Sequence, residues 1–332
     1  MTRVLQIVIL SVLALLPACG SPPHDSDGFS ITSKPSGPRV RILGIAQDGG
    51  VPHAGCSCDT CTAAHADPAK RFHVASLAII IPTDDGDPRT NEVYLIDATP
   101  DITEQLHMLR DVRDAPAGRT DRAPVDGVFL THAHMGHYTG LAHFGFESMH
   151  TQTTPVWCTE RMGGFLRRFG PWSQLVDKQE IEPRTLTPGE PVELGAGVTV
   201  TPILVPHRAE FTDTCAFVIG GPNTTVWYMP DCDPWGKWTA PIDEVLAGTD
   251  VALLDATFYS LDELPGRSLS EIGHPPIVTS MDALQSSSDA GLDVRFVHLN
   301  HTNPALDAGS PEQREIERRG FAVAREGSEI GL

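Results

Sequence analysis

The sequence predicts an α/β fold with a metal site at one edge of its sheets, and two observations support this prediction. Short apolar segments of strand length alternate with segments of helical pattern from about residue 40 onward, and such alternation is typical of layered α/β proteins. Histidine or aspartate directly follows several of the apolar segments. These are metal-ligating residue types, and we expect them to gather where strands end.

The composition indicates a folded domain, whose expected partner is a small-molecule substrate of the metal site described below. The chain has 332 residues with 40% hydrophobic content, enough for one large domain or two small ones. The net charge of −19 argues against nucleic acid and anionic membrane surfaces as partners. Solubility is the simpler explanation of this charge.

Residues 1–18 have the pattern of a secretory signal peptide. A basic end at Arg3 precedes an apolar run over residues 4–16 that is too short to span a bilayer comfortably. Cys19 follows at a position that resembles the lipidation site of bacterial lipoproteins. We therefore expect an exported lipoprotein, anchored to a membrane only by acyl chains on Cys19 and facing the periplasm or the exterior. Ordinary cleavage near Ala18, which would release a soluble exported protein, is the alternative.

Residues 19–38 are rich in Ser, Pro, Gly and Asp and show no apolar period. This composition predicts a flexible tether, so the folded domain is expected over residues 39–332. Within it, we expect strands at residues 40–45, 75–82, 92–97, 127–130, 155–158, 198–205, 214–219, 225–229, 251–255, 294–298, 321–324 and 329–332. Helices are expected at residues 102–114, 138–144, 159–168, 277–285 and from 311, and residues 257–276 form a candidate lid.

Three imidazoles lie within six residues, directly after the apolar segment 127–130. Alternate residues of a strand share a face, so His132 and His134 should point to one side, and the following turn should bring His137 back toward them. Neutral imidazole is the commonest transition-metal ligand. The cluster therefore predicts a metal site, and a solvated His-rich loop is the alternative.

Further candidate ligands follow later strands. His207 comes after residues 198–205, Asp231 after 225–229 and His298 after 294–298. A lone His at such a place is usually structural, and an Asp such as Asp231 often binds its own backbone in a turn. Their recurrence at strand ends favours the metal hypothesis.

A second group of metal-binding type is formed by Cys56, Cys58 and Cys61. A disulfide between Cys58 and Cys61 would leave one thiol free. Structural zinc explains all three thiols but needs a fourth ligand, either a nearby His such as His53 or His65 or one from far along the chain.

The motif T-H-x-H-x-x-H at residues 131–137, with His207, Asp231 and His298, resembles the metallo-β-lactamase superfamily. The resemblance implies a four-layer αββα sandwich with metal between the sheet edges. It implies one metal on His132, His134, His207 and Asp231, and a second on His137, His298 and the shared Asp231, with Asp231 and His298 as catalytic positions. Zinc is the expected metal, with manganese or iron as alternatives. Asp97 would hold the His-bearing loop from behind the ligands.

Two branches of the superfamily resemble the chain more closely. The CxCxxC segment with His298-x-x-His301 resembles the phosphonate-pathway cyclic phosphodiesterases, which implies structural zinc on Cys56, Cys58, Cys61 and His301. A longer resemblance is to coenzyme PQQ synthesis protein B (PqqB), through Gly49-Gly50, the cysteine segment and the stretches at residues 99–102, 156–159, 273–274, 302–307 and 310–312.

The chain departs from both patterns at the histidine cluster. The synthesis protein's pattern lacks the first two His and keeps an Asp-His, whereas this chain has His132, His134 and His137. Gly136 stands where the superfamily usually has Asp, which leaves the second metal one ligand short.

Three functions follow as hypotheses. The first is a metal-dependent hydrolase of the cell envelope, in which water activated by one or two metals attacks a phosphodiester, ester or lactone. The second is a PqqB-like role in pyrroloquinoline quinone biosynthesis or transport. The third, suggested only by Gly136, is a non-catalytic envelope binding protein.

Overall fold

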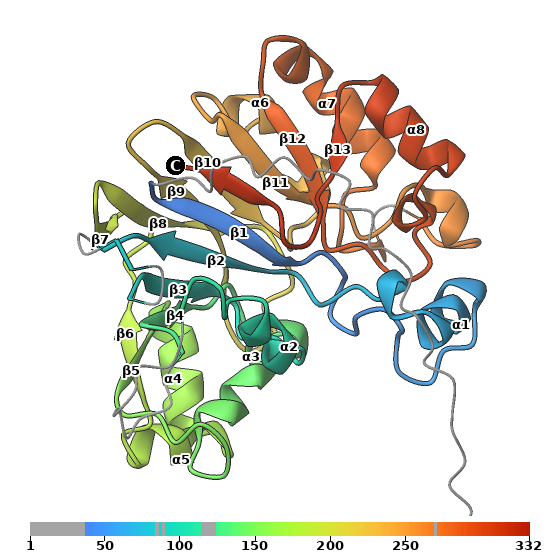
Figure 1. Ribbon diagram of the computed structural model, residues 1–332. Helices are drawn as coiled ribbons and strands as arrows, with labels where there is room; N and C mark the ends of the chain where they lie inside the picture. The colour runs from blue at the N-terminus through green and yellow to red at the C-terminus, as the bar shows by residue number, and fades with distance from the viewer. Residues whose placement is uncertain (1–36, 84–85, 88–89, 114–123, 269–270) are drawn as a thin grey trace, which may run out of the picture. The chain divides into compact units, whose positions relative to one another are not determined.

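The computed structural model describes residues 37–332 except 84–85, 88–89, 114–123 and 269–270 (Figure 1). The predicted signal peptide, Cys19 and nearly all of the predicted tether lie outside these residues. Residues Pro35–Leu332 form one compact unit. Within the described part of the chain, no helix combines the length and the apolarity needed to cross a membrane.

Two seven-stranded sheets form the centre of this unit, each with parallel and antiparallel neighbours (Figure 1). The first has the order β14-β1-β2-β3-β4-β5-β6 and the second β13-β12-β11-β10-β9-β8-β7. The first sheet comprises β1 (Arg39–Gly44), β2 (Ser76–Ile81), β3 (Glu92–Ile96), β4 (Gly127–Phe129), β5 (Thr154–Cys158), β6 (Ile181–Thr185) and β14 (Glu329–Gly331). The second comprises β7 (Val192–Gly195), β8 (Val198–Val205), β9 (Thr214–Gly220), β10 (Thr225–Met229), β11 (Val251–Asp255), β12 (Asp293–Val297) and β13 (Ala322–Val323).

Helices cover the outer faces of both sheets. In Figure 1, α2, α3, α4 and α5 lie beside the first sheet, and α6, α7 and α8 beside the second. The α-helices are α1 (Asp59–Ala66), α2 (Ile102–His107), α3 (Met135–Tyr138), α4 (Glu160–Arg168), α5 (Trp172–Asp177), α6 (Ile242–Val245), α7 (Ile277–Asp289) and α8 (Pro311–Arg318).

Strand β2 shows why the layers form. Its residues are all buried, as expected for a strand with a packed layer on each side. Leu77 and Ile79 belong to the core between the two sheets, which also contains Phe217 of the second sheet. Ala78 and Ile80 belong to the core between the first sheet and its helices. This alternation confirms the predicted αββα sandwich.

Several expected elements differ in detail. The helix predicted over residues 102–114 ends at His107, and the Asp101 side chain accepts a hydrogen bond from the Val74 backbone (2.8 Å) instead of capping the helix. The expected helix at residues 138–144 consists of α3 followed by the 3-10 turn η2 (Thr139–Phe144). Within the expected lid over residues 257–276, the described part contains the short 3-10 turn η4 (Leu261–Glu263).

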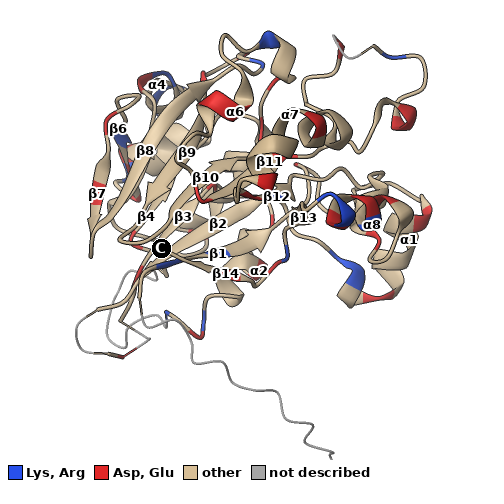
Figure 2. Cartoon of the chain, turned by 90° about the horizontal axis from the view of Figure 1, so that it is seen from above, with Lys and Arg blue, Asp and Glu red and all other residues tan. Residues whose placement is uncertain are grey.

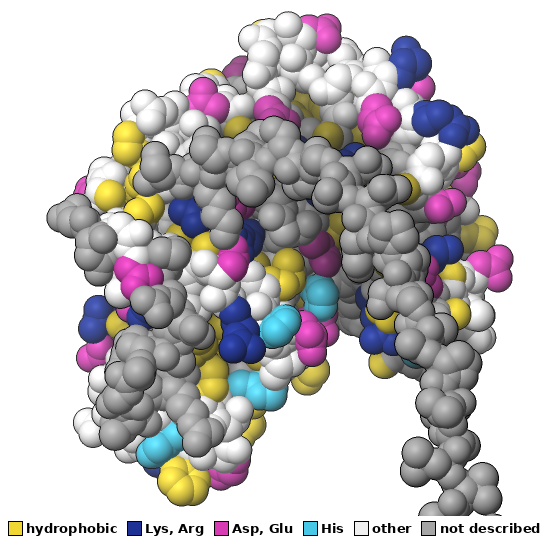
Figure 3. Space-filling view, viewed as in Figure 1, with side chains coloured by type: hydrophobic (Ala, Val, Ile, Leu, Met, Phe, Trp, Pro, Cys, Tyr) yellow, Lys and Arg dark blue, Asp and Glu magenta, His cyan; other side chains and the backbone are white. Residues whose placement is uncertain are grey.

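Acidic and basic side chains are interspersed over the described surface (Figures 2 and 3). The acidic excess is thus spread over many helices and loops. Such a distribution agrees with solubility as the explanation of the net charge.

A close backbone contact fixes the element that carries His137. Gly140 donates a hydrogen bond to Ala98 (2.9 Å), and Ala98 donates to the backbone of His137 (3.0 Å). A Cβ atom at Gly140 would lie 2.2 Å from the carbonyl oxygen of Thr99. The turn can therefore approach the end of β3 only with glycine at this position.

Replacing Gly140 by Ala should lower the free energy of unfolding by about 1–3 kcal/mol, because backbone must move to admit the methyl group. Urea unfolding followed by circular dichroism measures this. Gly164→Ala is the matched control, because no atom lies within 4 Å of the place that a Cβ would take at this exposed position of α4. This replacement should be neutral or stabilise by about 0.4–1 kcal/mol. Equal stabilities of the two variants would contradict the steric argument.

Candidate metal centre

The candidate ligands converge where strands of both sheets end. His132 and His134 follow β4 of the first sheet, and His137 lies in α3 immediately after them. From the second sheet, His207, Asp231 and His298 follow β8, β10 and β12 respectively. The structure therefore brings together six side chains that are up to 166 positions apart in the sequence.

The first group consists of His132, His134, His207 and Asp231, whose candidate ligand atoms lie within 4.8 Å of one another. His132 Nε2 is 3.2 Å from Asp231 Oδ2, and His207 Nε2 is 3.4 Å from Asp231 Oδ1. A tetrahedral zinc ion about 2.0–2.1 Å from each ligand would separate ligand atoms by about 3.3 Å. The spacing of this group suits such an ion.

A second group shares Asp231 and contains His137, His298 and Asp48. His137 Nε2 and His298 Nε2 lie 3.1 Å and 3.6 Å from Asp231 Oδ2. Asp48, in the loop after β1, was not identified from the sequence. Its position shortly after a strand is the same signal that identified the other ligands.

Asp97 orients two of the histidines from behind. It accepts hydrogen bonds from the backbone and hydroxyl of Thr131 and, at 2.7 Å, from Nδ1 of His137. The Thr131 hydroxyl in turn accepts from Nδ1 of His132 (3.0 Å). With Nδ1 protonated, Nε2 of each ring keeps its lone pair for a metal. The structure thus places Asp97 where the sequence analysis expected it.

Asp255 plays the part in the second sheet that Asp97 plays in the first. It was not identified from the sequence. It is fully buried at the end of β11 and accepts a hydrogen bond from the hydroxyl of Thr257 (2.8 Å). The hydroxyl of Thr257 accepts from Nδ1 of His298 (3.0 Å). The repeated tripeptide Asp-Ala-Thr, at residues 97–99 and 255–257, was the available signal.

His274 is a further imidazole at the centre. Its Nδ1 lies 2.8 Å from Asp255 Oδ2 and 3.2 Å from Asp231 Oδ1. Burial alone would lower the pKa of His274, but the neighbouring carboxylates outweigh it and raise the pKa to about 9. His274 belongs to a segment that resembles PqqB, but no role could be assigned to it from the sequence.

The carboxylate of Asp231 is ionised, as a metal ligand must be. Burial would raise the pKa of Asp231, yet the neighbouring His298 and His207 hold it well below its usual range, so the carboxylate stays ionised. Burial lowers the pKa of His132 and of His207, which favours the neutral, metal-binding form of each ring.

Several buried atoms of the centre make no hydrogen bond to any described residue. They are His137 Nε2, His298 Nε2, both ring nitrogens of His207 and Asp231 Oδ1. The contacts of 3.1–3.6 Å to Asp231 are close but lack hydrogen-bond geometry. Because buried polar atoms are normally paired, these unpaired nitrogens and oxygens fit a site that binds metal.

The cysteine segment forms a separate site with a distant fourth ligand. The Sγ atoms of Cys56, Cys58 and Cys61 each lie 3.6 Å from Nδ1 of His301. Tetrahedral zinc with typical sulfur and nitrogen bond lengths would give a separation of about 3.6 Å. No thiol in the described part of the chain is in a disulfide. The geometry favours structural zinc over the disulfide alternative, with His301 in place of His53 or His65.

Comparison with known proteins agrees with this architecture. Residues 92–301 match the family model described as a β-lactamase superfamily domain. Coenzyme PQQ synthesis protein B from Azotobacter vinelandii is 30% identical, and the alignment covers 88% of this chain and 99% of that protein. The protein of the same name from Rhizobium meliloti is 27% identical, over 90% of this chain and all of its own length.

Solved structures share the fold. Zn²⁺-bound PqqB from Methylobacterium extorquens superposes with a TM-score of 0.72 at 24% identity, covering 89% of this chain and 100% of that one. A diphosphatase from the PhnP family gives a TM-score of 0.59 at 22% identity, covering 88% and 96%. From the matched domain and the nearly end-to-end alignments, the chain belongs to the β-lactamase superfamily and, within it, to the family of coenzyme PQQ synthesis protein B.

Proposed function

We propose that the chain performs a metal-dependent step in the synthesis or handling of pyrroloquinoline quinone. The observation that carries this proposal is the alignment with PQQ synthesis protein B, which spans 88% of this chain and 99% of the relative. The candidate ligands from His132 to His298 also lie within residues 92–301, which match the superfamily model. This function takes precedence over the envelope hydrolase that the histidine motif alone suggested.

The proposed centre holds two metal ions that share Asp231. Zinc is the first candidate, because the solved relative is a zinc-bound protein and because imidazole and carboxylate donors suit zinc. The same donors also accept manganese or iron. When bound, such ions would polarise a substrate oxygen and lower the pKa of a coordinated water.

Other side chains of the protein orient the metal ligands and can transfer a proton. Asp97 and Asp255 fix His137 and, through Thr257, His298, so that the ligand nitrogens are aligned before substrate arrives. His274 donates from Nδ1 to Asp255. Its Nε2 is therefore the ring nitrogen available to exchange a proton with a bound substrate.

A hydrolase is the second candidate function, and one observation favours it. His132 and His134 complete a three-histidine, one-carboxylate donor set with His207 and Asp231, whereas the PQQ synthesis pattern lacks the first two His. Such a donor set is suited to water activation for attack on a phosphodiester, ester or lactone. Turnover of bis-p-nitrophenyl phosphate or of a lactone by the purified protein would support it.

Export and lipidation at Cys19 are a separate proposal that rests on the sequence of residues 1–19. It would place the chain at a membrane facing the periplasm or exterior, where it would handle the finished cofactor. Cys19→Ala should move the protein from the membrane fraction to the soluble fraction, because the acyl anchor is lost. The same distribution of wild type and variant after fractionation would refute lipidation.

Deleting the gene in its own host should lower the PQQ content of the cells or change its distribution across the envelope, as measured by mass spectrometry of cell fractions. The full-length wild type should restore the original level, and a His132→Ala/His134→Ala variant should not, because its metal centre is incomplete. Unchanged PQQ in the deletion strain would overturn the proposed role, and hydrolytic activity of the purified protein would then favour the second candidate.

The same double replacement should remove one metal equivalent per chain while the structural zinc stays bound. Elemental analysis by mass spectrometry after dialysis measures this content. His143→Ala is the matched control, because His143 lies nearby in η2, outside both metal-binding groups, with its Nδ1 3.4 Å from the hydroxyl of Ser148. Equal metal content in the double variant and the control would contradict the assignment of His132 and His134.

Replacing Cys56 by Ser should remove a different zinc equivalent and lower the melting temperature, since structural zinc contributes directly to folding. Cys158→Ala is the control, because Cys158 is buried in the core beneath the helices of the first sheet. It should lower stability through packing alone and keep the full zinc content. Full zinc content in Cys56→Ser would rule out the thiolate site.

A further inference from the structure

The second metal position lacks the aspartate that the superfamily pattern places at residue 136. This chain has Gly136 there, in α3 between His134 and His137. His137, His298 and Asp231 alone would give a divalent ion three protein ligands. A carboxylate from another part of the chain occupies the vacant place.

Asp48 supplies that carboxylate. Its Oδ1 lies 3.2 Å from His137 Nε2 and 3.8 Å from His298 Nε2, and it belongs to the same four-residue group as Asp231. This oxygen is buried and has no hydrogen-bond partner among the described residues. A buried carboxylate oxygen directed at two imidazole nitrogens is an expected arrangement for a metal ligand.

The positions of Asp48 and residue 136 exclude each other. A Cβ atom at Gly136 would lie 2.1 Å from Asp48 Oδ1 and 2.6 Å from Asp48 Cα. Real Cβ atoms do not approach other atoms so closely. The Asp48 side chain therefore fills the space into which a side chain at residue 136 would extend.

The loop that carries Asp48 is fastened to the strand end that carries His298. Gln47 donates a backbone hydrogen bond to Leu299 (2.9 Å), and Leu299 donates to Ile45 (2.8 Å). Asp48 directly follows Gln47, and His298 directly precedes Leu299, so both side chains are next to residues of this hydrogen-bonded pair. This short connection holds the two side chains at a fixed separation.

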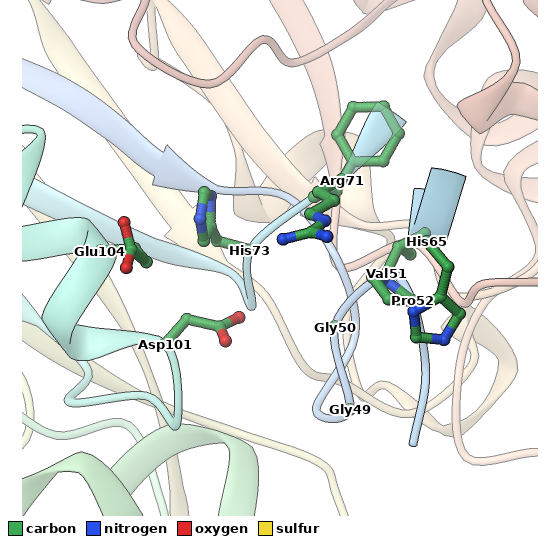
Figure 4. A pocket seen from close by; sticks show the side chains of 10 residues that line it. Gly49, Gly50, Val51, Pro52, His65, Arg71, His73, Asp101 and Glu104 are labelled. Carbon is green, nitrogen blue, oxygen red and sulfur yellow. The ribbon is translucent and has the colours of Figure 1, made fainter. Parts of the chain in front are cut away.

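Two glycines follow Asp48 in the sequence, and Figure 4 shows Gly49 and Gly50 in the loop beside a small pocket. Gly50 has a φ of +65° and donates a hydrogen bond to Gln47 (2.7 Å), which closes the turn in a conformation that favours glycine. A Cβ at Gly49 would lie 2.4 Å from the His53 ring. The turn lines a small pocket with His73 and Asp101, and it fixes the backbone beside Asp48.

We propose that Asp48 is a ligand of the second metal ion and replaces, from the loop after β1, the carboxylate that related metal centres place at residue 136. The proposal rests on the two-metal centre proposed above. The complete second donor set is Asp48, His137, His298 and the shared Asp231. Two imidazoles and two carboxylates suit Zn²⁺, Mn²⁺ and Fe²⁺.

The test compares Asp48→Ala and Asp48→Asn with wild type. Elemental analysis gives metal content, and Co²⁺ titration of the metal-depleted protein, read by its visible absorption, gives the affinity of each position. Both single variants should lose one ion or bind it at least about tenfold more weakly. The first ion and the structural zinc should stay.

Two controls separate folding from binding. Asp250→Ala removes an exposed carboxylate that accepts a backbone hydrogen bond from Thr225, at the opposite end of β10 from the centre, and it should keep all metal. Gly136→Asp alone should bind the second ion poorly and melt at a lower temperature, because Asp48 occupies the same space. If Asp48→Ala does not fold, the isosteric Asp48→Asn decides the test.

The outcomes distinguish the inference from the proposed function. Wild type that binds no second Co²⁺ ion beyond the first position would overturn the two-metal centre itself. Wild type with two ions and unchanged binding in both Asp48 variants would overturn the role of Asp48 alone.

Discussion

The contact on which the centre depends is the convergence of five imidazoles on the carboxylate of Asp231. His132, His137, His207, His274 and His298 each have a ring nitrogen within 3.6 Å of one of its oxygens. Asp231 is only 2% exposed, and burying a charge is costly unless it is paired or binds metal. The rings come from both sheets, so the sandwich itself supplies the compensation.

Two further carboxylates behind the ligands, one for each sheet, keep the convergence in place. Asp97 and Asp255 are both fully buried, and each directs imidazoles through a hydrogen bond or a threonine hydroxyl. Asp97 and His298 also have positive φ values of 67° and 64°, a conformation that costs free energy for residues other than glycine. The surrounding hydrogen bonds hold the backbone in this conformation. Strain and ordered polar contacts therefore coincide at the part of the fold that aligns the ligand nitrogens.

The sequence revealed those parts of the structure in which polar residues interrupt clear apolar runs. The αββα class and the convergence of His132, His207, Asp231 and His298 could be anticipated because each ligand follows a buried strand. Strand β6 was missed because it alternates exposed residues and contains Pro183, as an edge strand tolerates. Asp48 and Asp255 were missed although each follows a strand, because only their distances to residues far along the chain show that they belong to the centre. A sequence motif describes residues that are close along the chain, whereas metal binding depends on residues that are close in space.

This distinction changes the meaning of Gly136. Taken as a motif position, it suggested a damaged second site and was the only reason to consider a non-catalytic binding protein. In the structure, an aspartate at 136 and the observed Asp48 would compete for one volume, so glycine is what allows Asp48 to enter. What a metal centre requires is a carboxylate oxygen at a given point, and two chain segments can reach that point. The glycine then marks an exchange of ligand between segments, and the centre retains the donors that metal-dependent chemistry needs.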